Sequence, residues 1–419
     1  MDRLQITGGN QLKGTIKISG AKNAALPLMI TTILTNKPVI LKNVPKLADI
    51  KTLKDLLMSF GTKIEQLEDN TLQLDTSTLT SIRADYDLVR KMRASIFVLG
   101  PLLARSGEAE VSLPGGCAIG TRPVDLHLKV MEELGAKIEI KDGYIFAHAK
   151  DGLKGAEIIF PKVSVGATEN AIMAASLAKG QTILRNCAKE PEVIDLANCL
   201  NSMGAKITGA GEDKIVVDGV ESLNGTEYTV LPDRIEAGSY AIAACMTQGD
   251  ITLEEINYDD LTAFWSKLKE AGAQLEPSKD GKSVRIQMNK RPKAVDVMTE
   301  PYPGYPTDLQ AQIMALNAIS EGAGMITETI FENRFMHVPE LARLGSNITV
   351  HGSSALVRGV DKLNGAQVMA TDLRASMALV LAGLFAKGDT FVNRVYHLDR
   401  GYENLEEKLN RCGAQIKRL

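Results

Sequence analysis

The chain has 419 residues, of which 44% are hydrophobic and 24% are charged, and its formal net charge is −3. This composition is typical of a globular protein, and a chain of this length exceeds what one hydrophobic core usually supports, so we expect two domains. Acidic and basic residues are nearly balanced, which argues against a nucleic-acid or membrane-surface partner, because either would favour a basic excess.

Sequence signals for other compartments are missing. The N-terminal residues contain no basic segment followed by an apolar stretch, and the longest apolar run, residues 377–386, is about half a membrane span. The five cysteines are widely spaced and form no Cys-x-x-Cys motif, which argues against a disulfide framework and a structural zinc site. We therefore expect a cytoplasmic protein without a metal ion.

An internal repeat organises the chain. An apolar residue, a glycine, a small residue, a polar residue and an aliphatic residue recur in this order about every 70 residues. The glycines are Gly61, Gly135, Gly204, Gly272, Gly345 and Gly413. Apolar residues recur at helical spacing before each glycine, which predicts an amphipathic helix that ends at the glycine. A β-hairpin follows each glycine.

Each repeat also contains an earlier, more uniformly apolar helix. In chain order these predicted helices span residues 24–35, 95–104, 170–178, 238–247, 309–319 and 376–386. With the strand that follows each of them and the later hairpin, one repeat reads βαβαββ. Six such repeats predict an α/β fold with three repeats in each domain.

The two ends of the chain complement each other. The sixth repeat stops at Leu419 after one strand of its hairpin, whereas residues 3–18 precede the first helix. We therefore expect the N-terminal strand to join the C-terminal half, so that the chain closes on itself. The predicted domains are residues 21–230 and residues 1–20 plus 231–419, with a hinge near 20–21 and 230–231.

Charged residues that break the repeat pattern are candidate functional residues. Arg334 occupies a helix position that is apolar in most repeats. Arg122 and Arg400 occupy equivalent positions in the second and sixth repeats, just before a helix N-terminus, where backbone N–H groups favour anions. Two solvated arginines are the alternative interpretation, but the equivalence of the two positions favours a function.

The starts of the earlier helices are polar as well. They read Lys22-Asn23-Ala24, Arg93-Ala94-Ser95, Thr168-Glu169-Asn170, Arg234-Ile235-Glu236, Thr307-Asp308-Leu309 and Arg374-Ala375-Ser376. Arginine binds carboxylates and phosphates through two parallel hydrogen bonds. These helix starts therefore predict an anionic, phosphorylated substrate.

The second repeat carries a glycine-rich insertion, residues 112–122, that contains Cys117. Core packing does not explain a thiol flanked by glycine on a long loop, and loops of this kind act as lids. A thiol hydrolase with Cys117 as nucleophile and His127 as base is disfavoured, because His127 occupies an apolar position of its helix. A non-catalytic scaffold would leave the thiol and the equivalent arginines unexplained.

Seven motifs make the sequence recognisable over its whole length. They are Gly20-Ala-Lys-Asn-Ala24, Pro114-Gly-Gly-Cys-Ala-Ile-Gly120, Arg122-Pro-Val-Asp-Leu126, Lys162-Val-Ser-Val-Gly-Ala-Thr168, Phe331-Glu-Asn-Arg-Phe-Met-His-Val-Pro-Glu340, Ala370-Thr-Asp-Leu-Arg-Ala-Ser376 and Asp399-Arg-Gly-Tyr402. In this order they resemble the UDP-N-acetylglucosamine 1-carboxyvinyltransferase family of enolpyruvyl transferases. One departure is Glu169-Asn170, where relatives often carry apolar residues.

The resemblance implies a fold and an activity. The fold is a two-domain inside-out α/β barrel with the active site between the domains. The activity is transfer of enolpyruvyl from phosphoenolpyruvate to the 3′-hydroxyl of UDP-N-acetylglucosamine with release of phosphate, which opens peptidoglycan synthesis. No metal or organic cofactor is expected, and the sequence does not indicate the oligomeric state. The sister enolpyruvylshikimate-phosphate synthases share the fold but would not be expected to need the loop cysteine.

The resemblance also assigns roles to residues. Lys22, Arg122 and Arg400 would hold the phosphate of phosphoenolpyruvate, and Arg334 and Arg374 would hold its carboxylate. The nucleotide-sugar site would be lined by Arg93, Arg122, Pro123, Val124, Asp125, Leu126, Lys162, Ser164, Val165 and Ile330. Asn23 would lie beside both substrates, Asp308 would orient or deprotonate the sugar hydroxyl, and Cys117 would protonate the methylene carbon.

Overall fold

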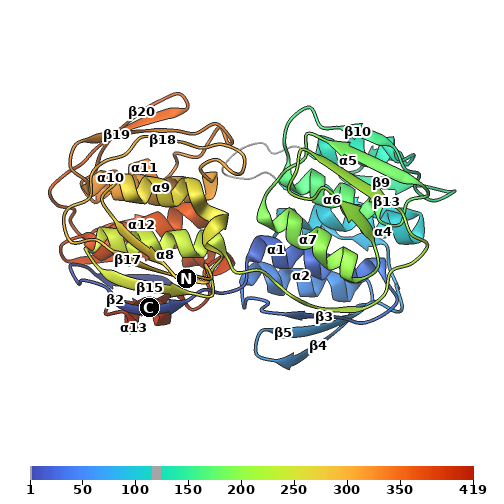
Figure 1. Cartoon of the computed structure of the whole chain (residues 1–419), viewed down its shortest axis with the longest axis horizontal. Helices are drawn as coiled ribbons and strands as arrows, with labels where there is room; N and C mark the ends of the chain where they lie inside the picture. The colour runs from blue at the N-terminus through green and yellow to red at the C-terminus, as the bar shows by residue number, and fades with distance from the viewer. Residues whose placement is uncertain (1, 116–123) are drawn as a thin grey trace. The chain divides into compact units, whose positions relative to one another are not determined.

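The computed structural model describes residues 2–115 and 124–419 (Figure 1). These residues divide into two compact units. The N-terminal unit comprises residues 20–115 and 124–231, and the C-terminal unit comprises residues 232–419 together with residues 2–19. Each unit has its own hydrophobic core.

The N-terminal unit alternates helices and short strands. Its helices are α1 (Lys22–Ile30), η1 (Thr31–Leu34), α2 (Ala48–Ser59), α3 (Tyr86–Val89), η2 (Arg93–Val98), α4 (Leu99–Ser106), α5 (Asp125–Glu133), α6 (Val165–Ala175) and α7 (Pro191–Ser202). Its strands are β3 (Val39–Lys42), β4 (Lys63–Glu68), β5 (Thr71–Asp75), β6 (Arg83–Ala84), β7 (Glu108–Ser112), β8 (Lys137–Lys141), β9 (Tyr144–His148), β10 (Glu157–Ile159), β11 (Gln181–Arg185), β12 (Lys206–Thr208), β13 (Lys214–Asp218) and β14 (Thr226–Thr229).

The C-terminal unit repeats this alternation. Its helices are α8 (Arg234–Met246), η3 (Tyr258–Leu261), α9 (Thr262–Glu270), η4 (Thr307–Leu309), α10 (Gln310–Ile319), α11 (Val338–Arg343), α12 (Leu373–Phe385), η5 (Val395–Arg400) and α13 (Leu405–Arg411). Its strands are β1 (Arg3–Thr7), β2 (Lys13–Lys17), β15 (Asp250–Glu254), β16 (Gln274–Pro277), β17 (Ser283–Gln287), β18 (Val297–Met298), β19 (Ala323–Thr327), β20 (Asn347–His351), β21 (Ser354–Arg358), β22 (Gln367–Met369), β23 (Asp389–Asn393) and β24 (Gln415–Arg418).

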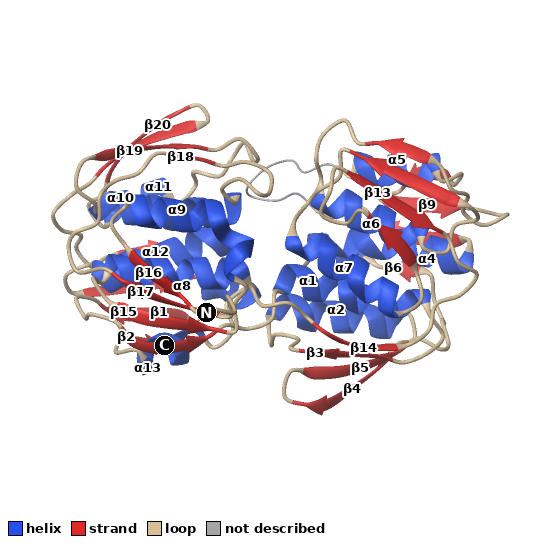
Figure 2. Cartoon of the chain, viewed as in Figure 1, coloured by secondary structure: helices blue, strands red, loops and turns tan. Residues whose placement is uncertain are grey.

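Sheets enclose helices in both units (Figure 2). The described part of the chain forms six four-stranded sheets, ordered β14-β3-β5-β4, β6-β7-β9-β8, β10-β11-β13-β12, β16-β17-β15-β2, β18-β19-β21-β20 and β22-β23-β1-β24. In each sheet one pair of strands is parallel and the others are antiparallel, and in four of the sheets the parallel pair is joined by a βαβ crossover. The predicted α/β fold of six repeats is confirmed.

The N-terminal strand closes the last sheet. β1 lies between β23 and β24 and pairs antiparallel with both, so that Ile6 is paired with Thr390 on one side and Ile416 on the other. Without β1, the sheet would leave β23 and β24 with unpaired backbone N–H and C=O groups. The predicted closure of the chain is therefore observed.

In the part that the structure describes, the chain passes between the two units at two crossovers, near residues 20–21 and 230–231. The strand that precedes each crossover, β2 or β14, pairs with a strand of another repeat. β2 leads into α1 along the chain but pairs with β15, the strand after α8. β14 leads into α8 but pairs with β3, the strand after α1. Each unit therefore completes one of its sheets with a strand whose continuation belongs to the other unit.

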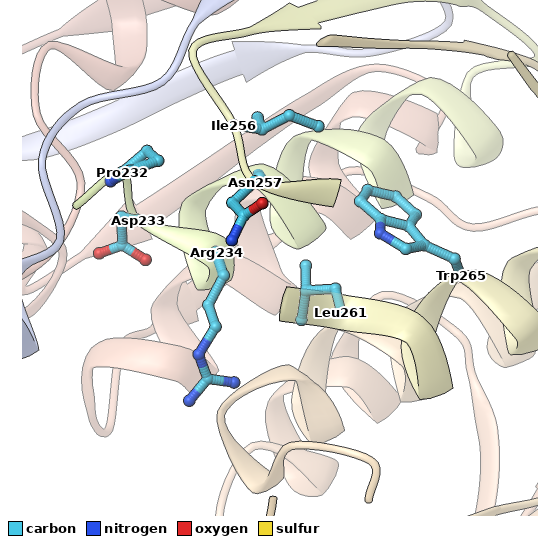
Figure 3. Close-up of a pocket in the computed structure, with 8 residues that line it drawn as sticks. Pro232, Asp233, Arg234, Ile256, Asn257, Leu261 and Trp265 are labelled. Carbon is cyan, nitrogen blue, oxygen red and sulfur yellow. The ribbon is translucent and has the colours of Figure 1, made fainter. Parts of the chain in front are cut away.

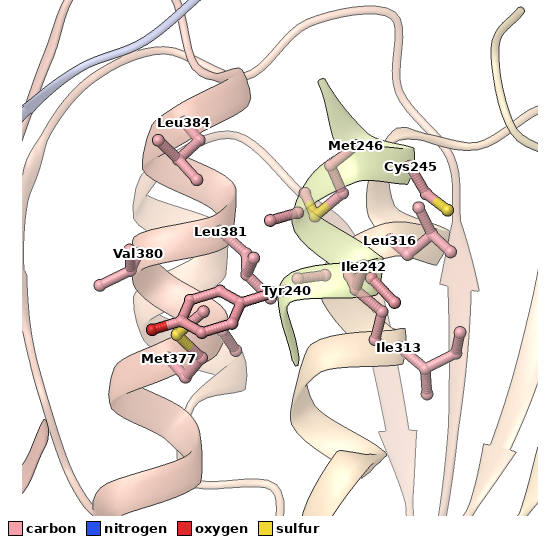
Figure 4. Close-up of a cluster of buried hydrophobic side chains, with 14 of the residues drawn as sticks. Tyr240, Ile242, Cys245, Met246, Ile313, Leu316, Met377, Val380, Leu381 and Leu384 are labelled. Carbon is pink, nitrogen blue, oxygen red and sulfur yellow. The ribbon is translucent and has the colours of Figure 1, made fainter. Parts of the chain in front are cut away.

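The earlier helix of each repeat is buried on all sides. In the C-terminal unit α8, α10 and α12 pack against one another, and residues 374–384 of α12 are buried without interruption. Figure 4 shows Tyr240 and Ile242 of α8, Ile313 of α10 and Leu381 of α12 in this cluster. Helices without a polar face are stable only inside such a core, which explains their uniformly apolar sequences.

The helix ends at glycine follow the prediction, but some helix starts do not. All six repeat glycines have φ between +94° and +104°, the left-handed conformation that ends a helix. In contrast, α6, α8 and α12 begin three to five residues before the predicted apolar spans, and at or up to three residues before the polar starts Thr168, Arg234 and Arg374. Side chains of Ser164, Asp233 and Asp372 accept backbone N–H groups there and cap the helices earlier than the apolar pattern indicated.

Candidate active site

An ion-paired cluster joins three segments of the C-terminal unit. Asp308 lies in η4, Arg334 lies ahead of α11, and Arg374 lies in the first turn of α12. Arg334 Nη2 donates to Asp308 Oδ1 and Arg374 Nη2 donates to Asp308 Oδ2, each at 2.7 Å. Both arginine side chains are 5% exposed and the aspartate side chain is 27% exposed. The structure thus brings Asp308 to the two arginines that the resemblance assigned to one carboxylate.

The charges in this cluster decide the ionisation of Asp308. Burial alone would raise the pKa of its carboxyl group, but the positive charges and hydrogen bonds of Arg374 and Arg334 outweigh burial. The pKa of Asp308 therefore lies well below its ordinary range. A carboxylate of this kind stays ionised at neutral pH and accepts hydrogen bonds readily, but it is a weak base.

Both arginines retain donors that no described residue satisfies. Arg334 Nε and Arg374 Nη1 are buried and have no hydrogen-bond partner among the described atoms. A buried N–H group without an acceptor is costly, and the cost is larger for a charged group. An anionic ligand that reached these atoms would remove this cost, as expected of residues that bind a carboxylate.

Thr307 and Glu328 support the cluster, and Glu328 was not among the site residues predicted from the sequence. Thr307 Oγ1 accepts a hydrogen bond from Arg334 Nη1 at 2.8 Å and donates to Glu328 Oε2 at 2.8 Å. Glu328 is 3% exposed. Its position directly after β19 carried no repeat anomaly, and only its buried acidic character could have drawn attention to it.

Arg400 and Ile330 also belong to the C-terminal unit. Arg400 is the last residue of η5 and is half-buried. Ile330 is 36% exposed, and its backbone N–H donates to Glu328 Oε1 at 2.8 Å. Both residues remain candidates for substrate contact.

In the N-terminal unit Lys22 starts a helix. It is the first residue of α1, whose N-cap, Ala21, offers no side-chain hydrogen bond. Lys22 Nζ donates to Asp49 Oδ2 at 3.3 Å, with the two side chains 12% and 5% exposed. The ammonium group and the helix N-terminus together favour a bound anion. Asn23 is exposed beside it.

Other helix starts of the N-terminal unit pack against one another. A Cβ on Gly166 of α6 would lie 2.8 Å from Phe97 of η2 and 3.3 Å from His127 of α5, so only glycine allows this approach. The helices η2, α5 and α6 therefore approach one another closely at Phe97, His127 and Gly166. Of the predicted nucleotide-sugar residues, these segments carry Arg93, Val124, Asp125, Leu126, Lys162, Ser164 and Val165.

The side chains of Glu169 and Asn170, the two residues at which the sequence departs from its relatives, are buried. Asn170 Nδ2 lies 3.1 Å from His127 Nδ1, and its Oδ1 accepts from the backbone N–H of Gly100. Glu169 is 2% exposed, and burial, together with the negative charges of Glu192 and Glu190, raises its pKa well above the ordinary value. His127 is 6% exposed, in agreement with its apolar position on the helix.

The described thiols are unreactive, and the predicted catalytic thiol lies elsewhere. Burial raises the pKa of Cys187, Cys199 and Cys245 to about 12, and it also raises that of Cys412. All four are buried and free. A thiol in such surroundings holds its proton and is inert. Cys117, Arg122 and Pro123 lie outside the described residues.

Two pockets in the described part of the chain lie away from these residues. One, with about 190 Å³ of empty space, is lined by Asp233, Arg234, Leu261 and Trp265 beside the start of α8 (Figure 3). The other, with about 740 Å³ of empty space, lies at the start of α2. Neither is lined by a residue that the resemblance assigns to a substrate.

Residues 2–115 and 124–419 contain no helix with the length and apolarity that a membrane span needs. They also contain no cluster of three or more histidine, cysteine or acidic side chains that could hold a metal ion.

Comparisons with known proteins agree with one another. Residues 6–409 match the family model described as EPSP synthase (3-phosphoshikimate 1-carboxyvinyltransferase). UDP-N-acetylglucosamine 1-carboxyvinyltransferases of Paramagnetospirillum magneticum and Gluconobacter oxydans are 58% and 57% identical to the chain. The alignments cover 100% of the chain, and 99% and 100% of these relatives.

Among solved structures, the enolpyruvyl transferase NikO from Streptomyces tendae is similar to the chain with a TM-score of 0.88 and 25% identity, covering 100% of this chain and 98% of NikO. EPSP synthase from Acinetobacter baumannii is similar with a TM-score of 0.78 and 18% identity, over 100% of both chains. The second likeness shows the fold alone.

Proposed function

Because the chain belongs to the UDP-N-acetylglucosamine 1-carboxyvinyltransferases within the EPSP synthase family, we propose that it transfers the enolpyruvyl group of phosphoenolpyruvate to the 3′-hydroxyl of UDP-N-acetylglucosamine. Inorganic phosphate is the second product. The observation that carries this conclusion is the identity of 57–58% over the whole chain. The reaction opens peptidoglycan synthesis, and we place the protein in the cytoplasm on that ground.

The cluster around Asp308 supports specific roles. Arg334 and Arg374 bind the carboxylate of phosphoenolpyruvate through the donors that Asp308 leaves free. Asp308 accepts the hydrogen bond of the sugar 3′-hydroxyl and orients its oxygen toward C2 of phosphoenolpyruvate. Its low pKa favours this orienting role over proton abstraction while both arginines hold it.

Residues of the N-terminal unit supply the other half of the chemistry. Lys22, with Arg122 and with Arg400 of the C-terminal unit, neutralises the phosphate. The segments that begin η2, α5 and α6 hold the nucleotide sugar with the residues named above. The same substrate therefore requires residues of both units.

The reaction proceeds by addition and elimination. The sugar oxygen forms a bond to C2 of phosphoenolpyruvate while Cys117 donates a proton to C3 and the hydroxyl proton passes to water. The Cys117 thiolate then takes a proton back from C3, the C2–C3 double bond reforms, and the C2–O bond to phosphate breaks. The arginine and lysine charges stabilise the negative charge that accumulates on the phosphate. No step draws on a metal or an organic cofactor.

The decisive assay is phosphate release from phosphoenolpyruvate with two alternative acceptors. We expect release with UDP-N-acetylglucosamine and none with shikimate 3-phosphate. Release with shikimate 3-phosphate alone would instead establish the sister activity of the EPSP synthase family.

The crossovers support a proposal for motion. We propose that the predicted domains, residues 21–230 and 1–20 plus 231–419, act as separate bodies joined by a hinge at these crossovers. In the N-terminal unit the backbone N–H of Ala21 donates to Leu231 O at 2.8 Å. In the C-terminal unit the backbone N–H of Asp233 donates to Ser19 O at 2.8 Å. The two connecting segments are thus hydrogen-bonded to each other in both units. Bending is therefore confined to the few residues between these two hydrogen bonds.

A further inference from the structure

Glu328 is a buried carboxylate that has no role in the function proposed above. Its Oε1 accepts three hydrogen bonds, from Thr299 Oγ1 at 2.9 Å and from the backbone N–H groups of Ile330 at 2.8 Å and Phe331 at 3.2 Å. Its Oε2 accepts from Thr307 Oγ1 at 2.8 Å. A buried charge with this many donors is fully satisfied and rigidly placed.

The hydroxyl of Thr307 has a fixed direction. Its oxygen lies 2.8 Å from Glu328 Oε2 and 2.8 Å from Arg334 Nη1. A guanidinium group can only donate and an ionised carboxylate can only accept. The hydroxyl proton must therefore point to Glu328, and a lone pair must point to Arg334.

Two contacts of Arg334 depend on Glu328. One is the hydrogen bond to Thr307. The other is the ring of Phe331, whose centroid lies 5.1 Å from the guanidinium carbon and whose backbone N–H is held by Glu328. The ion pair of Arg334 with Asp308 does not pass through Glu328.

We propose that Glu328 is a positioning residue that aims the guanidinium of Arg334 at the carboxylate of phosphoenolpyruvate by setting the polarity of the Thr307 hydroxyl. The proposal rests on the proposed function, which assigns Arg334 to that carboxylate. Glu328 itself touches neither substrate nor reacting atoms.

Glutamine cannot replace this carboxylate, although it has the same shape. If its carbonyl oxygen keeps the three donors on one side, its amide N–H turns toward Thr307, and the Thr307 hydroxyl proton loses the acceptor that fixed its direction. If the amide is flipped, its N–H groups face the backbone donors of Ile330 and Phe331. Either way a buried donor loses its acceptor, so the negative charge is needed as well as the shape.

The experiment compares two threonines on the same carboxylate. Thr307 contacts both Glu328 and Arg334, whereas the side chain of Thr299 contacts Glu328 and the backbone N–H of Thr329. The variants are Thr307→Val, Thr307→Ser, Glu328→Gln and the control Thr299→Val. Steady-state kinetics for each substrate and thermal unfolding are measured for the wild type and for each variant.

We expect Thr307→Val and Glu328→Gln to lower kcat/KM for phosphoenolpyruvate about tenfold to a hundredfold, the range of a hydrogen bond to a charged group. The KM for UDP-N-acetylglucosamine should stay within about twofold, since a specific loss affects one substrate. Thr307→Ser keeps the hydroxyl and should restore most of the loss. Thr299→Val should lower the unfolding temperature as much as Thr307→Val does but leave the kinetics near those of the wild type.

Three results would overturn the proposal. They are equal kinetic losses in Thr299→Val and Thr307→Val, wild-type kinetics in Glu328→Gln, and losses for both substrates in proportion to the drop in unfolding temperature. Wild-type turnover is measured first and decides the proposed function by itself. If the wild type does not transfer enolpyruvyl, both proposals fall, and if it does, the ratios of variant to wild type decide the role of Glu328 alone.

Discussion

Asp308 shares its charge between Arg334 and Arg374 through two contacts of 2.7 Å. The pairing holds its pKa well below the ordinary aspartate value, so the carboxylate stays ionised as the pH falls toward 4. We therefore expect the plot of kcat against pH to show no acid limb from this residue above pH of about 5. Asp308→Asn should lower kcat by about 10²-fold or more without changing the shape of that limb.

A matched control removes a neighbouring charge that the arginines do not contact directly. Asp233 caps α8 and acts on Arg374 through its charge, and asparagine also caps helices well. Asp233→Asn should therefore retain far more activity than Asp308→Asn. An acid limb near pH 6 that disappears in Asp308→Asn would show that Asp308 titrates as a base in the reaction.

Cys117 is the residue on which the proposed proton transfer to carbon depends. Burial suppresses the ionisation of the four described thiols, so a thiol reagent at neutral pH should modify Cys117 first and abolish turnover. An epoxide that carries a phosphonate should do the same. Cys117→Asp supplies another acid, so it should remain active and resist the epoxide, whereas Cys117→Ala should be inactive.

Labelling followed by mass spectrometry checks the order of modification, with Cys199→Ala and Cys245→Ala as controls that should label like the wild type. Turnover of Cys117→Ala at the wild-type rate across the pH range would rule out the thiol as the acid.

At the scale of elements, a glycine ends the later helix of every repeat. Gly135 is the position at which the stability cost of this left-handed backbone can be measured without a steric clash. Its φ is +94° and a Cβ there would meet no atom within 4 Å. Gly135→Ala should therefore lower the free energy of unfolding by about 1–2 kcal/mol, the energy that a residue with a Cβ needs to adopt the left-handed conformation. Urea unfolding followed by circular dichroism measures this loss.

Gly219 provides the contrasting case. A Cβ at this position would lie 1.7 Å from the backbone oxygen of Ala178, so alanine must displace a strand or a helix end. Gly219→Ala should lose several times more stability than Gly135→Ala, about 3 kcal/mol or more. Equal losses in the two variants would mean that the backbone relieves the clash at Gly219 by a small shift.

At the scale of the whole molecule, the proposed function assigns residues of both units to the same reaction. We expect UDP-N-acetylglucosamine to draw the two units together by rotation at the crossovers. The radius of gyration measured by small-angle X-ray scattering should fall when this substrate is added. Uridine alone is the control and should change it less. An unchanged radius at saturating nucleotide sugar would contradict the hinge.

The sequence by itself determined the repeats, their βαβαββ order, the glycine ends and the closure of the chain by β1. These follow from local patterns, because apolar periodicity and left-handed glycines act within one helix or one turn. Helix starts were less well predicted, since a cap such as Asp372 extends a helix beyond its apolar pattern.

The tertiary structure alone decided which polar residues meet. Asp308, Arg334 and Arg374 come from three separate segments, and no local pattern states that their side chains lie 2.7 Å apart. The same holds for Glu328, whose donors Thr299 and Thr307 come from the segment after β18 and from η4. Contacts between distant segments depend on the fold as a whole, and in this protein they determine the ionisation of Asp308 and the hydrogen bonds of Glu328.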